Sequence, residues 1–233
     1  MHLFYSTSVT NNQITLHDEE KNHCTKVLRK TIGDVVHIID GRGNLYESRI
    51  EAINKHDCLC SVLSSTPQFG THNYKLTMCV APTKNSDRFE FFVEKAVEFG
   101  IDEIIPIRTD NSERKILKLD RIEKIILSAM KQSYKADKPV LHELTDFADV
   151  LNRPFAGTAC IAHCYEGTKQ KLSHILPHNS TVCIAIGPEG DFSEQEVSQA
   201  LAKQWQAITL GESRLRTETA AIAAVHSVYS FFC

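Results

Sequence analysis

The first 64 residues alternate short apolar runs with turns, a pattern typical of β-strands. Residues 34–40 and 45–53 flank the glycine-rich turn GRGN and predict a hairpin. Residues 57–63 predict a further strand. One amphipathic segment, residues 17–30, is acidic at its start and basic at its end, as the helix dipole favours. We therefore expect a small β-barrel interrupted by one helix.

A polar stretch with Pro and Gly, residues 64–73, separates this part from a different pattern, and we expect the domain linker there. Beyond it, apolar runs alternate with helical periods, which predicts an α/β fold with a parallel sheet. The expected strands are 75–81, 102–107, 158–163, 181–186 and 207–210. The expected helices are 86–99, Leu119 to about Ala136, one from Ser193 and one from about Thr217. The predicted domains are residues 1–68 and 73–233.

The stretch IAIGPEGDFSEQE, residues 184–196, joins a strand to a helix through a tight glycine loop. Ser193 followed three residues later by Glu196 predicts a capping box. Gly187 and Gly190 would let a ligand approach the backbone closely, and the unpaired N–H groups at the helix start would face it. Alternatively, the glycines only supply the geometry of an ordinary turn.

A second strand-to-helix corner has the sequence ITLGESRLRTETAAIAAV. Thr217 is the expected N-cap of its helix. Arg214 and Arg216 stand just before an otherwise apolar helix, and arginine is costly to bury unpaired, so they suggest a carboxylate, phosphate or RNA partner. Alternatively, they pair with Glu212 and Glu218 at the surface. The final helix is apolar nearly all round, which fits either a dimer interface or burial within one chain.

Composition limits the class of protein but does not indicate a function. The chain has 233 residues, 42% of them hydrophobic, and a net charge of -3, so a nucleic-acid surface would have to be local. No run approaches the roughly 20 apolar residues of a membrane span, and the start does not resemble a signal peptide. We expect a cytoplasmic protein with no membrane partner and reduced cysteines.

Several common cofactor and metal motifs are missing. The chain has no G-x-G-x-x-G after a strand and no P-loop. Cys160, His163 and Cys164 lie close together, but no second ligand pair follows at zinc-finger spacing, so we expect no metal. His163 is interpreted as a loop residue near a cofactor or as a satisfied polar group of the core.

Residues 114–138 carry eight basic and three acidic side chains. The apolar stripe of the helix from Leu119 predicts that Lys131 and Lys135 lie on its outer side. These lysines either form a solvated face or contact the phosphates of RNA, and the sequence does not decide between the two.

Six segments, in order, resemble the ribosomal RNA small subunit methyltransferase E family of the SPOUT superfamily. The two corners IGPEGDFSEQE and LGESRLRTETA resemble its paired C-terminal motifs. The segments VLRKTIGD, DGRGNLY, APTKNSDRFEFFVEKAVEFGIDEIIPI and SAMKQSYKADKP resemble further parts of that family. The resemblance covers nearly the whole chain, and the segments together are specific although each alone is weak.

The resemblance implies an N-terminal PUA-like RNA-binding barrel and a C-terminal SPOUT methyltransferase domain with a parallel sheet and a trefoil knot. It implies S-adenosylmethionine as cofactor and methylation of N3 of one uridine in 16S ribosomal RNA, either free or in the assembled small subunit. It also implies a homodimer with the site at the subunit interface.

The matching motifs and the needs of methyl transfer to a uridine nitrogen together indicate the site residues. Arg216 is expected to orient or stabilise the uridine, with Glu189 and Glu218 as proton acceptors or orienting groups, although each carboxylate could instead cap a helix or pair with an arginine. The expected cofactor-binding residues are Ala162, His163, Ile186, Gly187, Pro188, Glu189, Gly190, Leu210, Gly211, Ser213, Leu215 and Arg216. The expected RNA-binding residues are Arg29, Lys30, Arg42, Lys84, Arg88, Arg114, Lys131 and Lys135.

Two positions depart from the family pattern. Asp191 stands where the family often has Gly, at a helix start where an acid is favourable. Asn111 stands where an Arg is often found, with Arg114 close by. Two other functions compete with the leading one: a SPOUT methyltransferase with a different RNA target, and a catalytically idle RNA-binding or ribosome-assembly factor.

Overall fold

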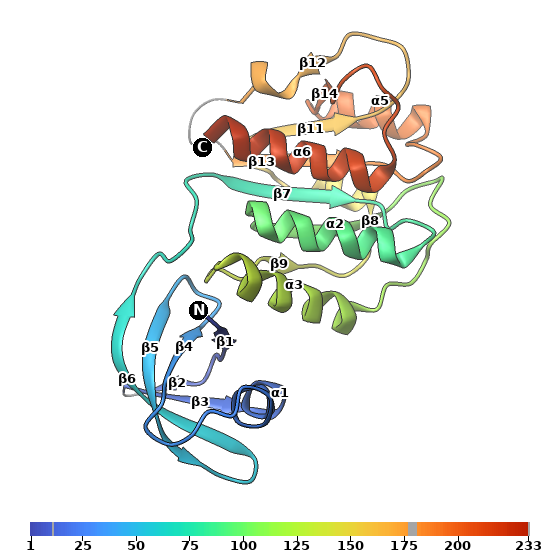
Figure 1. Ribbon diagram of the computed structural model, residues 1–233. Helices are drawn as coiled ribbons and strands as arrows, with labels where there is room; N and C mark the ends of the chain where they lie inside the picture. Colours follow the sequence, from blue (N-terminus) through green and yellow to red (C-terminus); the bar gives the residue numbers. More distant parts are fainter. Residues whose placement is uncertain (11, 177–180, 233) are drawn as a thin grey trace. The chain divides into compact units, whose positions relative to one another are not determined.

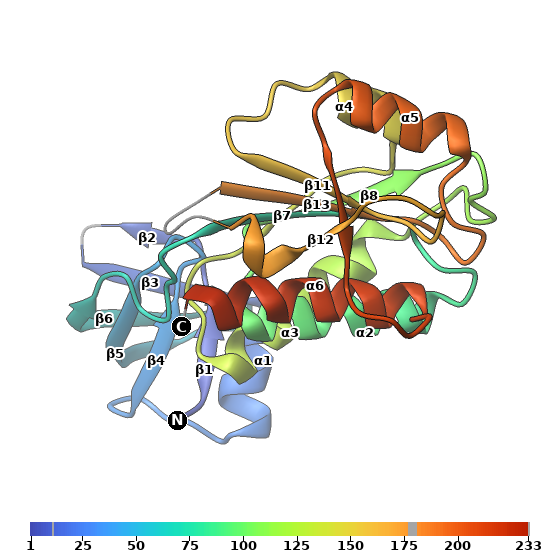
Figure 2. The same cartoon turned by 90° about the horizontal axis from the view of Figure 1, so that it is seen from above.

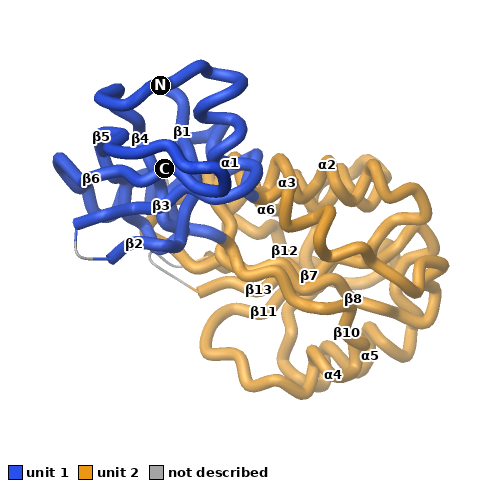
Figure 3. The backbone as a smooth tube through the Cα atoms, turned by 90° about the horizontal axis from the view of Figure 1, so that it is seen from below, with its two compact units in different colours: residues 1–71, 127–138 blue, residues 72–126, 139–233 orange. Residues whose placement is uncertain are grey.

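The computed structural model describes residues 1–10, 12–176 and 181–232. Its contacts divide the chain into two compact units, Met1–Thr71 with Leu127–Lys138 and His72–Ile126 with Pro139–Cys233 (Figure 3). The division falls inside helix α3, Leu119–Ser133, whose second half groups with the first unit. The ranges 1–68 and 73–233 expected from the sequence do not assign residues 127–138 to the first unit. Contacts between segments far apart in sequence leave no local pattern that would indicate this.

The first unit is built on one curled sheet (Figure 1). Its strands are β1 (Leu3–Tyr5), β2 (Val9–Thr10), β3 (Gln13–His17), β4 (Val35–Ile39), β5 (Leu45–Ile53) and β6 (Asp57–Thr66). Their order is β1-β4-β5-β6-β3-β2, and the pairs are antiparallel except β1 with β4. The predicted β4–β5 hairpin is confirmed. Because β1 and β2 end the path without pairing, the described strands form a half-barrel rather than a closed barrel.

The helix expected over residues 17–30 is shorter in the structure. Helix α1 spans Asp18–Asn22 and passes into a π-helical turn, His23–Val27. The amide of Leu28 donates to the carbonyl of His23, five residues earlier. Arg29 then takes a left-handed conformation with φ of 53°, which ends the helix. Arg29 and Lys30 therefore lie in a loop and not on the helix.

The second unit contains a parallel sheet, as predicted. The strands on its main path are β7 (Lys75–Val80), β8 (Glu103–Arg108), β10 (Thr145–Asp146), β11 (Thr158–Ala162), β12 (Gln170–Lys171), β13 (Thr181–Ile186) and β14 (Gln206–Thr209). Their order is β10-β8-β7-β13-β11-β14-β12, with β9 (Val140–Leu141) also paired to β8. Every pairing recorded between these strands is parallel, so their carboxyl ends share one edge.

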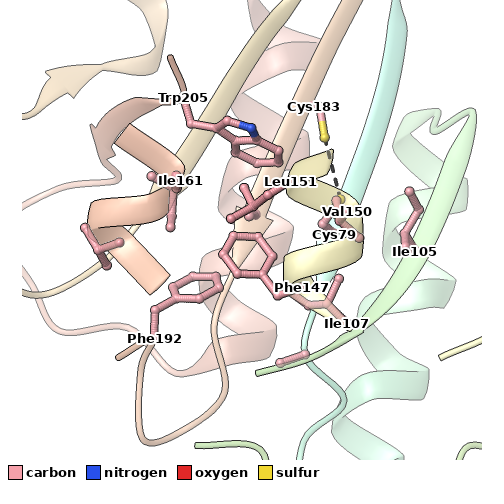
Figure 4. Close-up of a cluster of buried hydrophobic side chains, with 14 residues drawn as sticks. Cys79, Ile105, Ile107, Phe147, Val150, Leu151, Ile161, Cys183, Phe192 and Trp205 are labelled. Carbon is pink, nitrogen blue, oxygen red and sulfur yellow. Dashed lines mark hydrogen bonds between the residues drawn. The ribbon is translucent and has the colours of Figure 1, made fainter. Parts of the chain in front are cut away.

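Helices cover both faces of this sheet (Figures 1 and 2). Helices α2 (Ser86–Phe99) and α6 (Thr217–Phe232) lie against one face and contact each other. Helices α4 (Phe147–Asn152) and α5 (Glu194–Ala202) lie against the other. Beneath them a cluster of buried side chains forms a core, in which the Phe147 ring lies 4.8 Å from Phe192 and 5.9 Å from Trp205 (Figure 4). This core supports the loop that follows β13.

Helix boundaries agree with the sequence in most places. Helix α2 matches residues 86–99, and the capping box of Ser193 and Glu196 is confirmed. Thr217 is the first residue of α6 and not its N-cap, because the carbonyl of Arg216 already accepts the helical bond from the Ala220 amide. Cap positions are the least certain part of a sequence prediction, because one residue separates N-cap from N1.

Lys131 does not lie on a solvated outer face, as the sequence pattern suggested. Its side chain is 24% exposed and its ammonium group lies 2.5 Å from the carboxylate of Glu20, within the first unit. Lys135 is half-buried as well. The helix pattern could not indicate this contact, because Glu20 lies 111 residues earlier in the chain.

No helix in the described part of the chain is long and apolar enough to cross a membrane. The trefoil knot implied by the family resemblance stays a prediction.

Candidate active site

A cavity of about 1020 Å³ lies in the second unit, where β11, β13 and β14 end. Its walls are the loops that follow these three strands and the first turns of α6, together with Arg88 of α2. Open parallel sheets bind ligands at this edge, outside the carboxyl ends of the strands. The position therefore follows from the sheet topology.

The residues expected to bind a cofactor come together in this cavity. All twelve line it: Ala162, His163, Ile186, Gly187, Pro188, Glu189, Gly190, Leu210, Gly211, Ser213, Leu215 and Arg216. Of the three expected catalytic residues, Arg216 and Glu189 line the cavity and Glu218 does not. The two corners recognised in the sequence thus form two walls of one site.

The sequence indicated only part of the third wall, the loop after β11, through Ala162 and His163. Cys164, Tyr165 and Lys169 line the cavity in addition to His163. The Tyr165 hydroxyl donates to the Phe192 carbonyl at 2.8 Å, so this wall also supports the glycine loop after β13. The segment carries no motif, and only its place after a predicted strand indicated that it could reach the site.

Side chains hold the loop after β13 from two sides. One oxygen of the Glu189 carboxylate accepts the Lys84 amide at 3.1 Å. Asp191 takes a left-handed conformation with φ of 63°, and its carboxylate accepts the amides of Cys164 at 2.7 Å and Phe192 at 2.8 Å. A positive φ is where glycine is favoured, and aspartate tolerates it better than most residues. The departure at Asp191 therefore fits this backbone and adds two hydrogen bonds.

The glycines of this loop serve the protein's own packing. A Cβ atom at Gly187 would lie 3.1 Å from the Phe192 ring, and one at Gly190 would lie 3.2 Å from the Asn111 Cβ. Close approach of protein atoms thus explains these two glycines without the ligand approach that the sequence suggested. Gly211 differs, because its φ is 130° and no atom of the described residues lies within 4 Å of an added Cβ. It is required by backbone conformation at an open part of the cavity wall.

His163 lines the cavity and carries two unsatisfied ring nitrogens. Both ring nitrogens are buried, and neither has a hydrogen-bond partner among the described residues. The expectation of a satisfied core group is therefore wrong. Burial lowers the pKa of His163, Lys169 lowers it further, and Asp191 opposes the shift. The neutral form of the ring is thus favoured, with its donor and its acceptor both covered and without a partner among the described residues.

The arginines of the second corner are exposed. Neither Arg214 nor Arg216 makes an ion pair within the described residues, so the alternative of pairing with Glu212 and Glu218 is not realised. Glu218 is 13% exposed, and one of its oxygens lies 3.8 Å from the Arg88 Nε. Its other oxygen is buried and has no partner in the described part of the chain. Glu218 therefore acts on Arg88 rather than on the cavity directly.

Some of the expected RNA-binding cations in this unit are engaged with the protein. Lys84 lies 2.9 Å from the Glu113 carboxylate. Arg114 donates to the carbonyls of Thr83 at 2.9 Å and Lys84 at 2.6 Å, which fixes the loop after β7. A structural role for Arg114 is thus visible.

The first unit holds a different set of cations. Arg29 and Arg42 are exposed and Lys30 is half-buried. None of the three makes an ion pair within the described ranges of the chain. They remain available to a polyanion.

The described residues contain no group of three or more His, Cys, Asp or Glu side chains that could hold a metal ion. Cys160 is buried and Cys164 is exposed.

Comparison with known proteins defines the class. A model of an RNA methyltransferase domain matches residues 71–229, and a model of an RNA methyltransferase PUA domain matches residues 16–63. The chain therefore belongs to the RNA methyltransferase family, and the resemblance to the ribosomal RNA small subunit methyltransferase E family is confirmed.

Several relatives are similar over nearly their whole length. The chain is 28% identical to ribosomal RNA small subunit methyltransferase E of Rickettsia conorii, covering 94% of this chain and 90% of the relative. The crystal structure of a protein described as a probable rRNA-methyltransferase, from Porphyromonas gingivalis, is 37% identical with a TM-score of 0.92, covering 100% and 98%. That of ribosomal RNA small subunit methyltransferase E from Neisseria gonorrhoeae, bound to S-adenosylmethionine, is 28% identical with a TM-score of 0.86 and the same coverage. The last contains the cofactor expected from the sequence.

Proposed function

We propose that this protein transfers a methyl group from S-adenosylmethionine to N3 of a specific uridine in the 16S ribosomal RNA of the small subunit. The observation that carries the proposal is that both corners of the sequence, with the loop after β11, enclose one cavity at the carboxyl edge of the sheet. Relatives named ribosomal RNA small subunit methyltransferase E, one of them bound to S-adenosylmethionine, support the cofactor and the class of RNA.

The cavity suits this cofactor. Backbone groups of Ile186, Gly187, Leu210 and Gly211 would hold the adenosine part of the cofactor, and His163 lines the cavity beside them. S-adenosylmethionine, when bound, supplies an electrophilic methyl group on a sulfonium centre. The protein's task is then to hold the acceptor nitrogen in line with that methyl group and to exclude water.

N3 of uridine carries a proton and is a poor nucleophile until that proton leaves. Arg216 lies exposed at the cavity and has no carboxylate partner among the described residues, so its guanidinium can stabilise the uridine anion through the uridine oxygens. Glu189 lines the same cavity, and one of its oxygens is committed to the Lys84 amide. We assign Glu189 as the proton acceptor and Glu218 as the group that orients Arg88 toward the RNA.

The RNA-binding surface of the proposal has two parts. Arg29, Lys30 and Arg42 in the first unit would contact phosphates, which need positive charge but no sequence-specific geometry. Arg88 would contact the nucleotide next to the target uridine, because it lines the cavity. The target base would have to turn out of any pairing to reach the site.

The proposed enzyme acts in the cytoplasm as a homodimer. Helix α6 is mostly apolar, and Ile222 and Tyr229 remain half-buried within one chain. A second copy would cover these side chains. Sedimentation of the purified protein would test this part of the proposal, because a monomer at micromolar concentration would contradict it.

The direct test is the transfer of a radiolabelled methyl group from S-adenosylmethionine to ribosomal subunits from cells that lack this protein. We expect incorporation into small-subunit RNA and none into large subunits or transfer RNA. Equal incorporation into unrelated RNA would contradict the proposed target. No binding of S-adenosylmethionine in calorimetry would favour an idle assembly factor instead.

Arg216→Ala tests the assigned mechanism within the same assay. We expect at least a 100-fold loss of turnover, about the effect of removing one charge-stabilising donor, with cofactor affinity changed by less than about threefold. Arg153→Ala is the control, because Arg153 is an exposed arginine of the same unit that does not line the cavity. Wild-type turnover by Arg216→Ala would remove Arg216 from the mechanism.

A further inference from the structure

We propose that Asn111 is a positioning residue for the cofactor, because its side-chain amide fixes the cavity loop at Gly190 and Asp191. This inference rests on the proposed function, since it assumes that S-adenosylmethionine binds against that loop. Asn111 does not line the cavity and would touch neither cofactor nor RNA.

The contact is a pair of hydrogen bonds to successive carbonyl groups. The Asn111 Nδ2 lies 3.1 Å from the Gly190 oxygen and 3.1 Å from the Asp191 oxygen. Both donors of one amide are thus used on neighbouring peptide groups. The two fixed carbonyl groups set the planes of two successive peptide units. These two units flank Asp191, the residue with a positive φ. The turn is closed on its other side by the Asp191 amide, which donates to the Pro188 carbonyl at 3.0 Å.

Asn111 can act as a fixed point because its own loop is anchored. The amide of the preceding residue, Asp110, donates to the Glu196 carboxylate at 3.0 Å. The Asp110 carboxylate in turn accepts the Ser193 hydroxyl at 2.6 Å. These bonds tie the loop after β8 to the capped start of α5. Asn111 extends this anchored loop to the carbonyls of Gly190 and Asp191, at the cavity.

Glycine at position 190 belongs to the same arrangement. An added Cβ there would lie 3.2 Å from the Asn111 Cβ, so the two loops touch where the hydrogen bonds form. The cavity wall at Gly190 is therefore shaped from behind by Asn111. A side chain that accepts but cannot donate would repel both carbonyls and displace this wall.

Asn111→Asp is the sharpest test, because it keeps the shape and replaces the donor by a carboxylate. We expect the dissociation constant for S-adenosylmethionine to rise about tenfold or more, the effect of losing one to two hydrogen bonds. The KM for the cofactor should rise more than kcat falls, because saturation restores the loop. Asn111→Ala should give a smaller rise, because it removes the bonds without repulsion.

Asn152→Asp is the matched control. Asn152 is an exposed residue at the end of α4, and its oxygen accepts from the Lys203 ammonium at 3.0 Å, a bond that aspartate keeps. This variant carries the same change of charge away from the cavity. We expect wild-type cofactor affinity for it.

Hydrogen exchange of the ligand-free protein gives a readout that does not depend on the cofactor. Asn111→Asp should speed exchange in peptides covering residues 187–193, with the melting temperature within a few degrees of wild type. Unchanged exchange, or a lower melting temperature with unchanged cofactor affinity, would overturn the inference. If the wild type does not bind S-adenosylmethionine, the proposed function and the cofactor role of Asn111 are both overturned. Faster exchange in Asn111→Asp would in that case still establish that Asn111 holds the loop.

Discussion

Glu196 joins the start of α5 to the loop after β8, and its removal should be among the most costly single changes near the site. The side chain belongs to a residue that is only 8% exposed. One carboxylate oxygen accepts the Ser193 amide at 2.8 Å, and the other accepts the Asp110 amide at 3.0 Å. Glu196→Ala leaves both amides without their acceptor.

The size of the effect follows from these two bonds. A hydrogen bond to a charged group contributes about 1.5–3 kcal/mol, and each of these bonds is partly accessible to water, so two together contribute about 2–4 kcal/mol. In a protein of this size, 1 kcal/mol changes the melting temperature by about 2–4 °C. Glu196→Ala should therefore lower the melting temperature by about 4–16 °C.

Thermal unfolding followed by circular dichroism is the assay, and Glu194→Ala is the control. Glu194 lies in the same first turn of α5 but is exposed, so its charge contributes only about 0.3–1 kcal/mol through the helix dipole. Equal melting temperatures for Glu196→Ala and Glu194→Ala would refute the reasoning, because the two changes remove the same charge and differ only in the buried bonds.

Three further predictions concern the cavity and the RNA surface. Gly211→Ala should weaken cofactor binding in calorimetry, because alanine at φ of 130° forces the cavity loop into another conformation; unchanged affinity would show that the loop adapts. The pKa of His163 is lowered by burial below its ordinary 6.5, so its contribution to stability is complete above about pH 6.5 and is lost as the pH falls toward the folded-state pKa. The melting temperature of the wild type relative to His163→Gln should therefore fall below pH 6.5 and stay level above it; a difference independent of pH would contradict the buried neutral ring. Replacing Arg29 and Arg42 together by alanine should reduce the salt dependence of RNA binding by a slope of about 1–2, and an unchanged slope would exclude them from phosphate contact.

Local patterns in the sequence predict most of the elements of this fold. The strand at residues 181–186 and helix α2 at 86–99 have the expected bounds, because apolar period and flanking caps act over a few residues. The capping box of Ser193 and Glu196 is confirmed for the same reason. A parallel sheet then places the loops after its strands at one edge, which is why twelve residues chosen from two motifs and from the end of a third strand meet in one cavity.

The features that the sequence could not indicate depend on contacts between distant segments. Lys131 pairs with Glu20, and Asn111 bonds to a loop some 80 residues later. The π-helical turn at His23–Val27 shortened the expected helix without any proline or glycine to mark it. Gly190 was interpreted as a place for a ligand, but only the folded chain shows that an added Cβ there would lie 3.2 Å from the Asn111 Cβ.

The central claim is that this cavity serves methylation of uridine N3 in small-subunit RNA. The most direct measurement is nucleoside mass spectrometry of small subunits from cells lacking the protein, after incubation with purified protein and S-adenosylmethionine. The account predicts that 3-methyluridine appears with wild-type protein and is lost with Arg216→Ala. Appearance of a different methylated nucleoside would contradict the uridine assignment, and bound cofactor with no methylation of either subunits or free RNA would contradict the catalytic claim itself.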